Sequence, residues 1–189
     1  MMSQHCKNET ATVRRASVAD ADRLYWLINA AYRNSKSWTT ELSLDETTSE
    51  RMSKAEIIAT LQKGIDTILV AEVETEDGKL VVGCVAAESC KTHVDKQLPP
   101  ASALIGLFAV DPLRQSQGIG KLLLDSILEF VKTEWKCSLA VLWVIKQRTD
   151  VQKWYERLGF TWHGEIKHYK YPTKPMYDNV GFKVYTKDI

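Results

Sequence analysis

The sequence predicts a single α/β domain with one mixed, mostly antiparallel sheet flanked by helices. An apolar run at residues 103–110 leads through a glycine turn into an amphipathic segment at 119–131. A second strand-then-helix pattern occupies 139–158, and a β-rich hairpin covers 67–87. Strand, helix and strand in succession predict a right-handed parallel crossover, whereas a hairpin is antiparallel. One parallel pair among antiparallel neighbours makes the sheet mixed.

Length and composition favour one domain in a reducing compartment. The chain has 189 residues, and we expect a disordered segment at 1–10 and a single domain at 11–189. Its cysteines form no CxxC pair, and no apolar N-terminal segment resembles a signal peptide, which favours the cytoplasm, with the nucleus as an alternative. No apolar run approaches the roughly 20 residues of a membrane span. With 25 basic and 24 acidic residues, the charge argues against non-specific binding to nucleic acid.

The N-terminal part predicts one strand and two capped helices. Residues 12–15 form the candidate strand, and the capping box at 17–20 begins a helix. Its predicted apolar face is Ala21, Leu24, Tyr25, Ile28, Ala31 and Tyr32. A second capping box at 53–56 begins another helix, which Gly64 is expected to end.

The irregular segment between these helices contains Trp38 and Glu41. Loops on a rigid scaffold often carry function, so these side chains are candidates to face a ligand. The alternative is that Trp38 only anchors the loop to the core.

Two β-rich runs, at 67–72 and 80–87, flank the turn residues 76–79 and predict the hairpin. The loop that follows contains His93, which has no histidine or cysteine at ligand spacing. We therefore expect no metal site.

The strand at 103–110 is predicted to be buried on both faces, because it is apolar throughout and bounded by prolines. The helix after it places apolar side chains at helical spacing, and two glycines stand at its first turn. Free backbone N–H groups at such a turn suit an anion. The alternative is a tight strand-to-helix turn that binds nothing.

Two common phosphate-binding motifs do not fit this turn. The dinucleotide fingerprint GxGxxG would require glycine where Leu123 stands. The P-loop would require glycine and a hydroxyl where Gln115 and Leu122 stand. The pattern that remains is V-x-P-x-x-Q-x-x-G-x-G, formed by Val110, Pro112, Gln115, Gly118 and Gly120.

The C-terminal part predicts a strand at 139–145, a helix from 149 that ends near Gly159, and two further strands at 161–168 and 182–186. The end of the helix carries the pattern Y-x-x-x-G-F, formed by Tyr155, Gly159 and Phe160.

These two patterns, in this order, closely resemble the signatures of the GCN5-related N-acetyltransferases (GNAT), and the resemblance extends over residues 11–187. It implies the acyl-CoA N-acyltransferase fold, in which the central parallel strands splay apart. It also implies an enzyme that uses acetyl-CoA to acetylate a small-molecule or peptide amine by direct attack in a ternary complex. A monomer or a homodimer is expected.

The resemblance also implies which residues form the site. The coenzyme's pyrophosphate would lie on the backbone at the glycine turn, and its pantetheine arm along the splayed strand. The turn residues are Gln115, Ser116, Gln117, Gly118, Ile119, Gly120 and Lys121; the strand residues are Phe108, Ala109 and Val110. Tyr155 would protonate the leaving thiolate, since a phenol with a pKa near 10 is protonated at neutral pH. Its alternative role is that of a core aromatic.

Two departures from the family pattern leave the general base open. Gly106 stands where many members have an acid, and Arg148 where they have an asparagine. Glu41 is our first candidate for the base and Glu88 the second, with Glu72 also possible. Each has the alternative of being an ordinary surface carboxylate. Arg148 and Lys121 are either partners for the coenzyme's phosphates or solvated charges.

Two other functions therefore stay open. One is a non-catalytic module that binds or senses acyl-CoA. The other is an interaction protein in which the glycine turn binds nothing.

Overall fold

The computed structural model describes residues 10–33, 50–64, 66–92, 98–168 and 181–189. They form a seven-stranded sheet with the order β1-β2-β3-β4-β5-β7-β6. The strands are β1 Thr12–Arg15, β2 Thr67–Thr75, β3 Gly78–Ser89, β4 Ser102–Val110, β5 Leu139–Ile145, β6 Thr161–His168 and β7 Gly181–Asp188. The expectation of a disordered N-terminus concerns residues outside the described ones, apart from residue 10.

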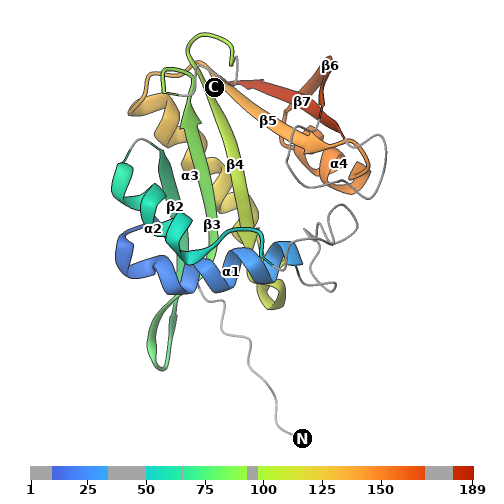
Figure 1. Cartoon of the computed structure of the whole chain (residues 1–189). Coiled ribbons are helices and arrows are strands. Elements are labelled where there is room, and N and C mark those ends of the chain that lie inside the picture. Colours follow the sequence, from blue (N-terminus) through green and yellow to red (C-terminus); the bar gives the residue numbers. More distant parts are fainter. Residues whose placement is uncertain (1–9, 34–49, 65, 93–97, 169–180) are drawn as a thin grey trace, which may run out of the picture.

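Helices cover both faces of the sheet (Figure 1). On one face, α1 (Ala21–Arg33) and α2 (Lys54–Lys63) bury Leu24, Ile28 and Ile57 against β2 and β3. On the other face, α3 (Ile119–Thr133) and α4 (Thr149–Arg157) pack on a second apolar cluster. None of the described helices is both long enough and apolar enough to cross a membrane.

The predicted mixed sheet is confirmed. Among the described strands, only β4 and β5 pair in parallel, and α3 forms the crossover between them. Their pairing covers four residue pairs, from Ser102↔Leu139 to Ile105↔Leu142. From Gly106 onward β4 has no pairing with β5, so the expected splay is present.

A β-bulge lies where the two strands separate. On the β3 side, Ala86 pairs with Gly106 and Cys84 with Ala109, so two residues of β4 oppose one of β3. Leu107, one of those two, has a φ of 45°, which is unusual for a residue with a side chain. The bulge therefore fixes the backbone direction of β4 at the splay.

The local signals at the helix ends are largely confirmed. Ser53 and Glu56 form a capping box, and Gly64 ends α2 with a φ of 62°. The box at Ser17 opens the 3₁₀ turn η1 (Val18–Asp20), which directly precedes α1. Leu27, absent from the predicted apolar face, is fully buried, because α1 packs against α2 as well as the sheet.

Candidate active site

The splay leaves one side of β4 open between Gly106 and Val110. Asp111 N–H donates to Val82 O at 2.9 Å, so the backbone groups of Asp111 and, by alternation, Ala109 face β3. Those of Phe108 and Val110 consequently face the open side. Ala109 pairs with Cys84 and buries its side chain under α1, so it does not offer hydrogen-bonding groups to the open edge.

The loop after β4 is shaped for an anion. Asp111 Oδ1 accepts from Leu113 N–H at 3.1 Å and begins the 3₁₀ turn η3 (Pro112–Arg114). Gln115 Nε2 then donates to Val110 O at 3.2 Å. Ser116 and Gly118 have φ values of 64° and 84°, and α3 begins directly afterwards. Left-handed residues before a helix N-terminus turn successive N–H groups toward one concave space.

The two glycines of this loop act for different reasons. No described atom lies within 4 Å of a Cβ placed on Gly118, but its positive φ strains any other residue. At Gly120 a Cβ would lie 3.5 Å from Trp154 Cζ2 and 3.6 Å from Phe108 Cε1, which is ordinary contact. Gly120 therefore faces an aromatic layer, and a small side chain there would contact Trp154 and Phe108.

That aromatic layer surrounds Tyr155. The ring of Phe108 lies edge-on to Trp154 at 5.7 Å, and Trp154 lies 4.8 Å from Tyr155. Tyr155 is 7% exposed, and burial raises the pKa of its phenol above the ordinary value. Among the described residues no hydrogen bond engages its hydroxyl. The buried ring of Tyr155 is thus connected to the ring of Phe108 through Trp154.

Helix α1 holds the open segment at both ends. Arg23 Nη2 pairs with Asp111 Oδ2 at 2.8 Å, and Arg23 Nε donates to Val81 O at 2.7 Å. Tyr32 OH donates to Phe108 O at 3.0 Å. Sequence reasoning missed both residues. For Arg23 the only signal was Asp111, an acid directly after a buried strand, which needs a cationic partner when it is buried.

The carboxylates predicted as bases lie in different places. Glu88 is half-buried on β3, opposite Leu104, and is thus on the sheet face covered further along by α1. Glu41, Trp38 and His93 lie outside the described residues. Gly106 leaves open space, with no described atom within 4 Å of a Cβ placed on it.

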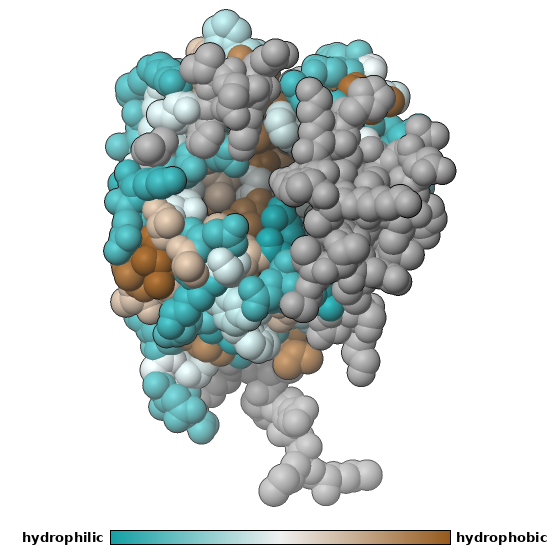
Figure 2. All heavy atoms as spheres, viewed as in Figure 1, coloured by the Kyte–Doolittle hydropathy of each residue, from teal (hydrophilic) through white to brown (hydrophobic). Residues whose placement is uncertain are grey.

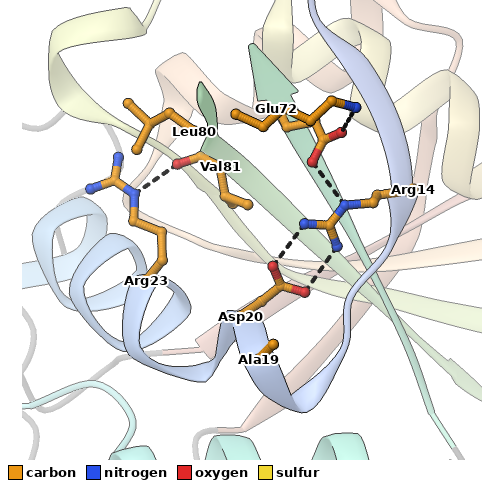
Figure 3. Close-up of a pocket in the computed structure, with 8 residues that line it drawn as sticks. Arg14, Ala19, Asp20, Arg23, Glu72, Leu80 and Val81 are labelled. Carbon is orange, nitrogen blue, oxygen red and sulfur yellow. Dashed lines mark hydrogen bonds and ion pairs between the residues drawn. The ribbon is translucent and has the colours of Figure 1, made fainter. Parts of the chain in front are cut away.

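Glu72 belongs to an ion-pair network away from the splay. Figure 3 shows Arg14 between Asp20 and Glu72 at the edge of a polar hollow, with Arg23 nearby on the Val81 carbonyl. Lys79 and Arg14 each lie 2.8 Å from the Glu72 carboxylate and hold its pKa below the ordinary value. Since β3 separates it from β4, Glu72 is not placed to deprotonate an amine at the open edge.

The two predicted phosphate cations have carboxylate partners. Lys121 pairs with Asp125 one turn along α3, and Arg148 with Asp150 at 2.9 Å. Within the described ranges no cluster of three or more potential ligands could hold a metal ion.

Part of the sheet face that carries α1 and α2 is not covered by these helices, and it is more apolar than the surface around it. Figure 2 shows a mostly hydrophilic surface with apolar residues in a recess over the strands beside α2. Leu104, Val141 and Val184 form an apolar cluster, and Trp143 packs on it. By the register, Trp143 stands across the splay from Gly106. An acceptor approaching from this face therefore meets apolar walls.

A parallel strand pair that opens beside a glycine turn at a helix start is the architecture of the acyl-CoA N-acyltransferases. The sequence model of the acetyltransferase (GNAT) domain matches residues 64–162. The chain belongs to this family of acetyltransferases, which use acetyl-CoA as donor.

Solved structures of low sequence identity share the fold. The structure of yncA from Salmonella typhimurium with its cofactor acetyl-CoA has a TM-score of 0.68 at 16% identity, covering 95% of this chain and 94% of that one. The structure of ribosomal-protein-alanine N-acetyltransferase from Brucella melitensis has a TM-score of 0.68 at 19% identity, covering 94% of this chain and 99% of that one. The structure of Arabidopsis thaliana NAA60 with a bisubstrate analogue has a TM-score of 0.68 at 14% identity, covering 95% of this chain and 99% of that one. Curated protein sequences gave no significant match.

Proposed function

We propose that this enzyme transfers the acetyl group of acetyl-CoA to an amine by direct attack in a ternary complex. The observation that carries the proposal is the position of Tyr155, which is buried against Trp154, the ring that in turn packs on Phe108 of the open segment of β4, and whose hydroxyl has no hydrogen bond among the described residues. Two structural neighbours, the ribosomal-protein-alanine N-acetyltransferase and NAA60 in complex with a bisubstrate analogue, support a small-molecule or peptide amine as acceptor.

When bound, acetyl-CoA supplies the acetyl group as a thioester. The N–H groups from Gln115 to Lys121 would hold its pyrophosphate, as the left-handed Ser116 and Gly118 direct the loop backbone inward. Phe108 and Val110 would pair their backbone with the pantetheine amides, in the manner of an added strand. The side chain of Gln115 has a supporting role, because it donates to Val110 O.

Tyr155 would act as the general acid. The amine nitrogen forms a bond to the acetyl carbon, the carbon–sulfur bond breaks, and the phenol gives its proton to the departing thiolate. Burial raises the pKa of this phenol, which is therefore protonated at neutral pH, as a proton donor must be. The attacking nitrogen loses one proton, for which Glu41 is our first candidate acceptor and Glu88, directly or through water, the second.

The test compares two buried tyrosines. Tyr155→Phe keeps the ring, so coenzyme affinity and folding should change little, whereas loss of a positioned acid should lower turnover on the order of 10²-fold. Tyr185→Phe is the matched control, because it removes another buried hydroxyl, one that donates to Glu156 at 2.9 Å. It should lower stability and leave turnover unchanged. Wild-type turnover by Tyr155→Phe, under conditions where chemistry limits the rate, would make Tyr155 structural.

The alternative is a non-catalytic acyl-CoA-binding or sensing module, which the glycine at position 106 favours because it removes one potential base. Tight CoA binding by calorimetry, with no transfer to any amine in a broad panel, would support that alternative. Absence of CoA binding would argue against both functions.

A further inference from the structure

Tyr32 lies in the last turn of α1 and reaches the strand at the point where the sheet opens. Its hydroxyl donates to Phe108 O at 3.0 Å. Phe108 belongs to the bulge that follows Gly106, the first residue of β4 without a partner on β5. A hydroxyl from a helix is therefore fixed on the backbone that the proposed function assigns to the coenzyme.

Two tyrosines approach Phe108 from opposite faces of the sheet. The Phe108 ring packs with Trp154, next to Tyr155, in the cluster under α3 and α4. Tyr32 packs instead with the cluster under α1 and α2. The face of Tyr32 is also the face on which Gly106 leaves open space and Trp143 stands across the splay. Tyr32 thus lies on the side opposite the proposed acid.

Resting on the proposed function, we propose that the Tyr32 hydroxyl binds the nitrogen of the acceptor amine. This hydroxyl gives its hydrogen to Phe108 O, and a phenol oxygen that donates its hydrogen can also accept a hydrogen bond. An N–H of the incoming amine donates to that oxygen, which directs the nitrogen lone pair toward the acetyl carbon. Tyr32 takes no proton; it holds the nucleophile while Tyr155 protonates the thiolate on the other face.

The ring of Tyr32 is held in place independently of its hydroxyl. The Arg51 guanidinium lies 5.4 Å from the ring centroid, and the ring packs on the apolar cluster under α1. Tyr32→Phe should therefore keep the ring where it is and remove only the oxygen. This makes the substitution a clean test of the hydroxyl.

The experiment measures coenzyme affinity and amine kinetics separately. The acceptors are short peptides with a free α-amino group, spermidine and 2-phenylethylamine, and the amine with the fastest wild-type turnover is used for comparison. We expect Tyr32→Phe to lower kcat/KM for that amine about 10-fold or more, the equivalent of one lost hydrogen bond. The calorimetric Kd for CoA and the melting temperature should change little.

Tyr25→Phe is the matched control, since it removes a hydroxyl from the same helix, one that donates to Glu50 at 2.6 Å. It should leave kcat/KM unchanged. If Tyr32→Phe weakens CoA binding as much as it lowers kcat/KM, Tyr32 only positions the strand and the inference is wrong. Unchanged kcat/KM also overturns it. If the wild type binds CoA but acetylates none of the amines, the proposed function fails and the inference fails with it.

Discussion

Gly118 shows how one backbone angle determines the shape of the loop that we propose as the anion site. Its φ of 84° is left-handed, and the loop before α3 depends on it to direct the N–H groups of the first helical turn inward. A side chain would meet no described atom within 4 Å, so the requirement is conformational rather than spatial. An L-residue pays roughly 1–2 kcal/mol to adopt this region.

We expect Gly118→Ala to lose stability and coenzyme affinity together. The strained loop should relax and misalign its N–H groups, which should raise the Kd for CoA on the order of 10-fold, as measured by calorimetry. Gly64→Ala provides the control, because Gly64 has a φ of 62° at the end of α2 and no described atom within 4 Å of a Cβ placed there. It should lose similar stability and keep wild-type affinity. Equal affinity in both variants would exclude Gly118 from the site.

At the scale of elements, an ion-pair network links β1 to η1 and to the neighbouring strand β2. Arg14 pairs with Asp20 and Glu72, both at 2.8 Å. The Arg14 guanidinium and the hydrogen bonds from Ser17 lower the pKa of Asp20 to about 2. Because the folded pKa lies below the ordinary value near 4, this contribution to stability is complete above about pH 4 and is lost as the pH falls toward 2.

We therefore expect Asp20→Asn to be destabilising at neutral pH, with a difference that shrinks as the pH falls below about 4 and is largely lost only below about pH 2. The difference at pH 7 should be on the order of 1 kcal/mol, reduced by screening because the Arg14 side chain is 40% exposed. Urea unfolding of both proteins at several pH values measures it. Asp22→Asn, which removes an exposed pairing with Lys54, should show a much smaller change. A pH-independent difference for Asp20→Asn would contradict the assignment.

The elements themselves were predictable wherever neighbouring residues specify them. The capping box at Ser53 and the strand-to-helix turn at Gly118 are local patterns, and both are confirmed. The hairpin strands extend further than predicted, to Thr75 and from Gly78, because polar residues continue the pairing. Local patterns identify such elements but not their exact ends.

The contacts that complete the candidate site were not predictable, because they join distant residues. Arg23 and Asp111 are 88 positions apart, and Tyr32 and Phe108 are 76 apart. The positive φ of Leu107 has no signal in its residue type. Glu72 looked like a candidate base because a lone acid in a strand gives no sign of a partner such as Arg14.

At the scale of the whole molecule, the sheet consists of two groups of strands that are joined to each other by a short pairing. Strands β2, β3 and β4 pair through long antiparallel registers, β1 adds four residue pairs at the edge of β2, and α3 packs on this part. Strands β5, β7 and β6 form the second part, to which α4 is fastened by Gln152 donating to Ile145 O at 3.0 Å and by Tyr185 donating to Glu156. Between the two parts, the strand pairing of the described residues consists of the four residue pairs of β4 with β5.

The short join between β4 and β5 has a consequence for cooperativity. Amide hydrogens in β5, β6 and β7 should exchange with solvent through a partial opening that leaves β2 and β3 protected, so the protein should show two exchange groups rather than one. Saturating CoA, bound across the splay, should slow exchange in β5, β6 and β7 more than in β2 and β3. Native-state hydrogen exchange followed by mass spectrometry measures both groups, and identical exchange free energies in all the strands would contradict this expectation. A ligand that completes the sheet would then link two folding units into one.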